Sequence, residues 1–103
     1  MSFFRINEAL AGKPALGSEV TIKGWVRTRR DSKAGFSFIN VHDGSCFEPI
    51  QVVAPGDLDN YESEIKKLTS GCAVTCTGTF VESGGRGQQY EIQATRISVH
   101  GWV

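Results

Sequence analysis

The chain has 103 residues, 40% of them hydrophobic, and its 11 Lys and Arg residues balance its 11 Asp and Glu residues. This length predicts one domain with one core, which is small for a catalyst of several steps. Zero net charge gives no support for bulk attraction to nucleic acid, and no apolar run approaches the ~20 residues of a membrane helix.

Charge is unevenly spread along the chain. Basic residues concentrate between Lys23 and Lys33, and acidic residues gather between Asp57 and Glu64. This distribution fits a local contact with an anionic partner rather than a long phosphate track. Two ordinary solvated faces would explain it equally well.

The N-terminal stretch has no basic segment followed by an apolar core, so no secretory signal is predicted. Three cysteines are an odd number, and their spacing with the two histidines does not match a zinc site. We therefore expect reduced, structural cysteines, no metal, no membrane contact and a cytoplasmic location.

The first predicted elements are a short helix and a strand. Apolar residues at Phe4, Ile6 and Leu10 predict the helix, and residues 1–17 form a lead-in to a domain at 18–103. From residue 19 the chain alternates between two faces, as a half-buried strand does. One face has Val20, Ile22, Gly24 and Val26, and the other has Thr21, Lys23, Trp25 and Arg27.

A second strand is predicted at residues 36–42, after a glycine turn. Ile39 and Val41 share one face and point inward, because side chains alternate along a strand. The opposite face carries Phe36, Phe38, Asn40 and His42. Two aromatic rings among polar groups on an outer face indicate that something stacks on them. A second small core, or contact with another domain, is the alternative.

A third strand is predicted at residues 48–54, with Gln51 on the outer face beside Phe38. An amphipathic helix is then predicted, because apolar residues recur at steps of three, four and three. These residues are Leu58, Tyr61, Ile65 and Leu68.

Two more strands are predicted at residues 72–81 and 89–99, joined by a glycine-rich tip. The tip is not a phosphate loop, because a strand pattern follows it instead of a helix. Glu91 faces outward on the last strand, and Arg86 at the tip is a candidate contact for a nucleic-acid backbone.

Five strands with a helix between the third and fourth predict an all-β OB-fold, a Greek-key barrel whose outer face binds oligonucleotides. Arginines, outward phenylalanines and a side-chain amide suit an unpaired base, which needs stacking surfaces and edge-reading groups. The candidate RNA-binding residues are Arg27, Arg29, Arg30, Lys33, Phe36, Phe38, Gln51, Arg86 and Glu91. No catalytic set is found among them.

Four segments together resemble the N-terminal anticodon-binding domain of bacterial-type asparaginyl-tRNA synthetases, in the class II subgroup with the aspartyl and lysyl enzymes. They read VTIKGWVRTRRDSK, FSFI, DGSCFEPIQ and QQYEIQA. The resemblance implies a partner, the anticodon loop of tRNA(Asn) with its central uridine. Phe38 would stack on that base, and Arg30, Gln51 and Glu91 would frame its edge. Strict alternation from Val20 turns Arg30 inward, so this role requires a bend or bulge late in the first strand.

The resemblance also implies a catalytic domain after residue 103 that uses ATP and Mg, within a homodimeric asparagine–tRNA ligase. The domain itself is expected to hold no cofactor and no catalytic residue. Two other classes stay open at this point. One is a general single-strand-binding OB domain, and the other is an OB module for protein interaction.

Overall fold

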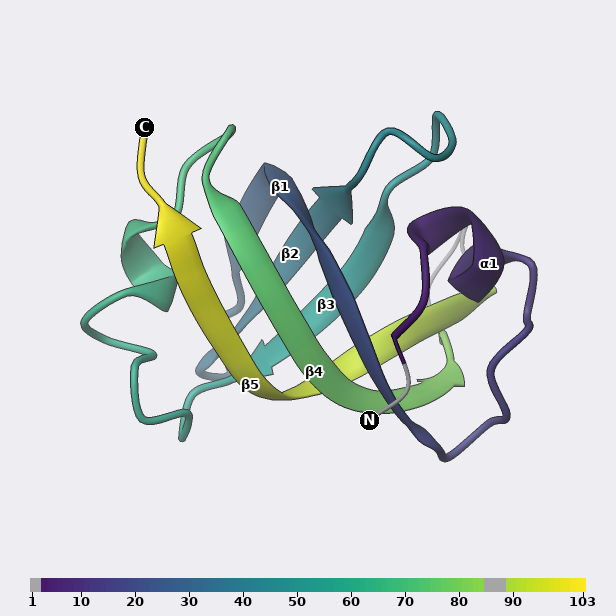
Figure 1. Ribbon diagram of the computed structural model, residues 1–103. Helices are drawn as coiled ribbons and strands as arrows, with labels where there is room; N and C mark the ends of the chain where they lie inside the picture. Colours follow the sequence, from purple (N-terminus) through teal and green to yellow (C-terminus); the bar gives the residue numbers. More distant parts are fainter. Residues whose placement is uncertain (1–2, 85–88) are drawn as a thin grey trace.

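A computed structural model describes residues 3–84 and 89–103. Five strands close into one barrel in the order β1-β2-β3-β5-β4 (Figure 1). They are β1 (Glu19–Asp31), β2 (Phe36–His42), β3 (Ile50–Pro55), β4 (Ala73–Glu82) and β5 (Tyr90–Gly101). Neighbouring strands run antiparallel except β3 and β5, which are parallel. The predicted five-stranded barrel is confirmed.

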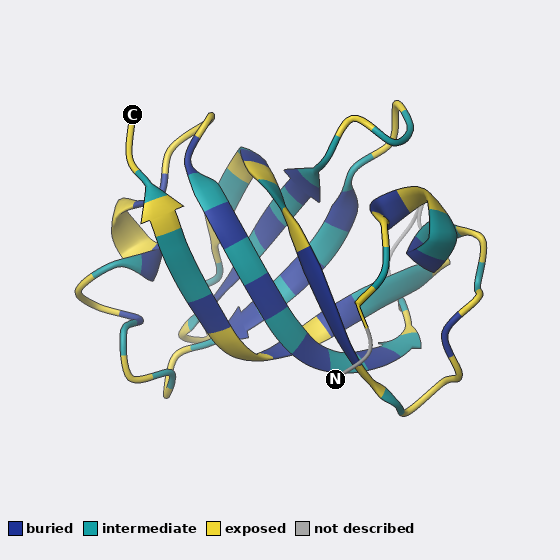
Figure 2. Cartoon of the chain, viewed as in Figure 1, coloured by how far each residue is buried: buried dark blue, intermediate teal, exposed yellow. Residues whose placement is uncertain are grey.

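The core lies inside the barrel. Burial alternates residue by residue along β2, β3 and most of β4, which gives the banded strands of Figure 2. Ile39 and Val41 are fully buried, as are Ile50 and Val52 across the β2–β3 pair. The inward and outward faces predicted for these strands are therefore confirmed, since the side-chain period of two matches the sequence.

The N-terminal segment packs on the barrel instead of standing apart from it. Helix α1 (Ile6–Leu10) buries Ile6 and Ala9 in the common core. Residue Phe3 forms an isolated parallel bridge to Thr21, which is only 2% exposed although alternation places it on the outer side of β1. Its hydroxyl is satisfied by a hydrogen bond to that of Thr77 at 2.9 Å.

A β-bulge divides β1. Val26 pairs with Val41 and Thr28 pairs with Asn40, so Arg27 is an extra residue on β1. The insertion exchanges the faces of all later residues in the strand, because side-chain direction alternates. Arg30 consequently lies opposite Phe38 on the outer face, and the bulge expected from the sequence is confirmed.

The connection between β3 and β4 differs from the predicted amphipathic helix. It consists of turns with one short 3-10 helix, η1 (Ile65–Lys67), and a further turn before β4. Its apolar residues Tyr61, Ile65 and Leu68 are buried as the pattern indicated. The Asn60 side chain donates to the Ile97 carbonyl and to Glu64, both at 2.8 Å, and so ties these turns to β5. Among the described residues, the helices are too short to span a membrane.

Candidate nucleic-acid interface

An arginine and an aromatic ring form the centre of the outer face. The guanidinium of Arg30 lies over the ring of Phe38, with Cζ 4.9 Å from the ring centroid. Direct pairing of these two residues across β1 and β2 produces the contact. A ring flanked by a cation in this way offers a π surface and several N–H donors at one place.

A second pair brings hydrogen-bonding groups beside that ring. Gln51 and Glu91 are partners in the parallel β3–β5 pairing, and Gln51 Nε2 donates to Glu91 Oε1 at 3.2 Å. An ionised carboxylate only accepts hydrogen bonds, so Glu91 selects the amide orientation that points Nε2 toward β5. Across β2 and β3, Gln51 faces Asn40 directly, and Phe38 is its diagonal neighbour.

These side chains line one hollow of about 760 Å³ on the outer face. Asn40 Nδ2 donates to Thr28 Oγ1 at 2.9 Å and so links β2 to the residue that follows the bulge. The complete lining is Thr28, Arg30, Phe38, Asn40, Gln51, Gly84 and Glu91. The structure therefore brings together Arg30, Phe38, Gln51 and Glu91, which were predicted from distant parts of the sequence.

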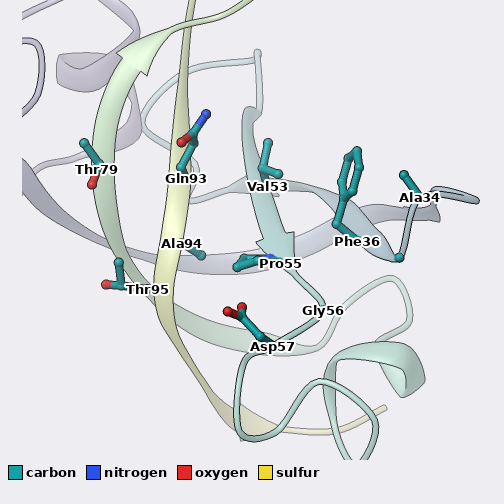
Figure 3. A pocket seen from close by; sticks show the side chains of 11 residues that line it. Ala34, Phe36, Val53, Pro55, Gly56, Asp57, Thr79, Gln93, Ala94 and Thr95 are labelled. Carbon is teal, nitrogen blue, oxygen red and sulfur yellow. The ribbon is translucent and has the colours of Figure 1, made fainter.

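Phe36 belongs to a neighbouring hollow of about 760 Å³, shown in Figure 3. Its ring meets that of Phe38 edge to face, with centroids 5.1 Å apart. Both rings are half-buried. In Figure 3, Val53 and Gln93 rise beside Phe36 from adjacent strands, and Asp57 lies across the hollow. The two hollows meet at the phenylalanine pair.

Arg29 does not join this group. After the bulge it lies opposite the buried Ile39, and its Nε donates to the Leu68 carbonyl at 2.9 Å. Its Nη1 also binds both carboxylate oxygens of Asp31 at 2.6 Å. Hydrogen bonds from Arg29 and Ser37 hold the pKa of Asp31 below its ordinary value of 3.8. Arg29 thus joins β1 to the β3–β4 connection.

The other basic residues that were predicted to bind RNA are more dispersed. Lys33 is exposed in the β1–β2 turn, and Arg86 lies outside the described residues. Arg27, the bulge residue, has its guanidinium over the ring of Phe47, with Cζ 5.5 Å from the centroid. Among residues 3–84 and 89–103, no cluster of three His, Cys, Asp or Glu side chains has the arrangement of a metal site.

Sequence reasoning missed three residues of this surface. Thr28 and Asn40 were not singled out together, because their contact depends on the position of the bulge. Phe47 was also missed, although its side chain is 82% exposed. An aromatic residue inside the turn-rich DGSCFEP segment was the available signal, since turn segments are dominated by Gly, Pro, Asn, Asp and Ser.

A family model described as an OB-fold nucleic acid binding domain matches residues 20–100. Among curated proteins, the chain is 57% identical over its whole length to the asparagine–tRNA ligase of Idiomarina loihiensis. It is 59% identical to the asparagine–tRNA ligase of Pseudoalteromonas translucida. The chain spans 22% of the length of each of these relatives.

Solved structures give a matching result. The asparaginyl-tRNA synthetase of Entamoeba histolytica superposes on the whole chain with a TM-score of 0.77 and 27% identity, over 24% of its own length. The enzyme from Pyrococcus horikoshii, complexed with asparaginyl-adenylate, covers 97% of the chain with a TM-score of 0.83 and 19% identity, over 22% of its length. The second likeness concerns the fold alone.

Proposed function

The chain belongs to the family of OB-fold nucleic acid binding domains, and on that premise we propose that it binds the anticodon loop of tRNA(Asn). The asparagine–tRNA ligases that match its full length support this choice of partner. One structural observation carries the proposal. The Arg30–Phe38 pair and the Gln51–Glu91 pair share a single hollow on the outer face of the barrel.

The central uridine stacks on Phe38. Loop bases are unpaired, so each can offer its π face to an aromatic side chain and its edge to polar groups. A base stacked on this ring is within reach of Arg30, because the Arg30 guanidinium lies 4.9 Å from the ring centroid in the structure without RNA. The neighbouring hollow beside Phe36 gives the strand room to continue.

Discrimination between uridine and cytidine follows from fixed donors and acceptors. Uracil presents N3–H and O4, whereas cytosine presents an N3 acceptor and an N4 amino group. A free amide could turn to suit either base, but Glu91 directs Nε2 of Gln51 toward itself and so removes that freedom. Arg30 only donates, so it favours a carbonyl over an amino group. Both constraints favour uracil.

We further propose that this module belongs to a homodimeric, cytoplasmic asparagine–tRNA ligase. The activation of asparagine with ATP and Mg would then take place in the other part of such a protein, since the chain spans 22% of its curated relatives. In this division of labour the barrel supplies recognition of the tRNA and no reacting group.

A salt titration tests the proposal. The chain should bind an RNA stem-loop with the Asn anticodon, and the logarithm of the affinity should fall linearly with the logarithm of salt concentration, because basic side chains that contact phosphates release the counterions condensed on the RNA. Oligo-dT of equal length should bind more weakly. Equal binding of oligo-dT would indicate a general single-strand-binding domain, and absence of salt-dependent RNA binding would indicate a protein-interaction module.

A further inference from the structure

Phe47 is the most exposed aromatic residue among those described, and its position needs an explanation. Its side chain is 82% exposed in the connection between β2 and β3. An aromatic ring held in water gains none of the stabilisation that burial gives a phenylalanine side chain. Its close contact among the described residues is with Arg27, whose Cζ lies 5.5 Å from the ring centroid. The same combination of cation and ring occurs at Arg30 and Phe38.

Arg27 is the bulge residue, and alternation along β1 already places it on the outer face beside Trp25. In a β-bulge two residues of one strand oppose a single partner, and here Arg27 is the extra residue between the Val26–Val41 and Thr28–Asn40 pairs. Thr28 and Asn40 already line the hollow that contains Phe38. Arg27 and Phe47 therefore continue the same surface toward the β2–β3 connection.

The backbone around Phe47 is held on both sides. Before it, Asp43 Oδ1 accepts from the Ser45 amide at 2.9 Å, and Ser45 Oγ accepts from the Asn7 amide of α1 at 3.0 Å. Spanning it, the Cys46 thiol donates to the Glu48 carbonyl at 3.3 Å. A ring presented on a fixed backbone loses little conformational freedom when a ligand binds, which favours binding.

We propose that Phe47 and Arg27 form a second nucleotide-binding platform for the RNA that occupies the Phe38 hollow. A base stacks on the exposed ring of Phe47, and the guanidinium of Arg27 pairs with a phosphate of the same strand. This inference rests on the proposed function. On β2, Asn40 and Phe38, which oppose Thr28 and Arg30, lie two positions apart, about 7 Å at ~3.3 Å per residue. Two stacked nucleotides cover about the same distance at ~3.4 Å each.

A single strand fits this surface better than a protein partner does. The surface alternates cations and rings, Arg27 with Phe47 and Arg30 with Phe38, which is the composition of single-strand binding grooves. A protein-binding centre would have a contiguous apolar core, whereas here each of the two rings is paired with an arginine.

The test compares variants of the chain in binding an Asn anticodon stem-loop and the same stem-loop with cytidine at the central position. Phe47→Ala should weaken binding of both RNAs to the same extent, by about 5-fold to 150-fold, the range for one lost base–aromatic stack. Phe47→Leu should weaken both as well, because it keeps the apolar bulk but removes the π face. Arg27→Gln should lower the salt slope by about 1.

Leu16→Ala is the matched control, since Leu16 is an exposed apolar residue that lines neither hollow. Melting temperatures of the Phe47 variants should equal that of the unchanged chain.

If Phe38→Ala weakens binding while Phe47→Ala does not, the platform is refuted and the proposed function stands. If the unchanged chain does not bind the stem-loop at all, the proposed function itself has failed. If Phe47→Ala weakens the uridine stem-loop alone, Phe47 reads base identity and the stacking role assigned to it is wrong.

Discussion

Arg29 donates from Nε to the main-chain carbonyl of Leu68 at 2.9 Å, and this bond joins the end of β1 to the connection between β3 and β4. Arg29→Ala should therefore lower the free energy of unfolding by about 1–3 kcal/mol, because it leaves a carbonyl of a buried residue without its donor. Urea denaturation measures this change. Affinity for the stem-loop should be almost unchanged under conditions where the variant is folded.

Lys33→Ala is the control for Arg29→Ala, because Lys33 is exposed and its removal should change stability by less than ~0.5 kcal/mol. A large loss of RNA affinity in Arg29→Ala at unchanged stability would instead assign Arg29 to the RNA contact.

Phe38→Ala should weaken stem-loop binding by about 1–3 kcal/mol, the range for one base–aromatic stack, and leave the fold intact. Its ring packs edge to face on Phe36, so a stability loss of about 0.5–1.5 kcal/mol is expected. Phe80 is fully buried, and Phe80→Ala should cost about 3–5 kcal/mol of stability. Equal stability losses in the two variants would refute the outward role of Phe38.

Arg30→Ala should narrow the affinity gap between the uridine and cytidine stem-loops by about 1–3 kcal/mol, the size of one lost polar readout. Gln51→Ala should lower affinity for the uridine stem-loop. If Arg30→Ala weakens both RNAs equally, Arg30 contacts phosphate and does not read the base.

Glu91→Gln isolates the orientation of the Gln51 amide. A glutamine can donate as well as accept, so it no longer fixes Nε2 of Gln51 toward β5. The uridine preference should shrink although the side chain keeps its size and position. Titration of both stem-loops against this variant measures the effect, and an unchanged preference would show that Glu91 does not orient Gln51.

The hydrogen bond between Asp43 and α1 should make the stability of the fold sensitive to acid. Burial raises the pKa of Asp43, but hydrogen bonds from Ser45 and from the Ile6 amide outweigh it and leave the pKa below 3.8. A carboxyl with a lowered folded pKa stabilises the fold above its unfolded pKa, and this contribution is lost as pH falls through the folded value. Unfolding free energy should thus decline below about pH 4, and Asp43→Asn should flatten that decline. If the unfolding free energy declines equally with falling pH in the unchanged chain and in Asp43→Asn, Asp43 is not the cause of the decline.

The barrel and most of the central site could be predicted because period-two patterns determine which side chains share a face. Ile39 and Val41 fix the outward direction of Phe38 in this way. Alternation also predicted Gln51 on the same outer face as Phe38, but register is a tertiary property, so their diagonal offset, with Asn40 directly opposite Gln51, could not be predicted. The prediction of a helix after β3 was wrong for a related reason. Turns bury the same apolar residues that a helix would bury, and the hydrogen bond from Asn60 to Ile97 joins this segment to a strand far along the chain.

The parallel seam between β3 and β5 has a consequence for motion. It consists of three residue pairs, and Gln51 and Glu91, which we propose to act together in reading the base, form one of them. A short ladder between distant segments is a natural place for local opening, and any opening there carries Glu91 away from Gln51. RNA bound to both strands would oppose that separation. Amide hydrogen exchange at Val52 and Ile92 should therefore slow when RNA binds, so that binding on the outer face reduces local opening of the buried residues behind it.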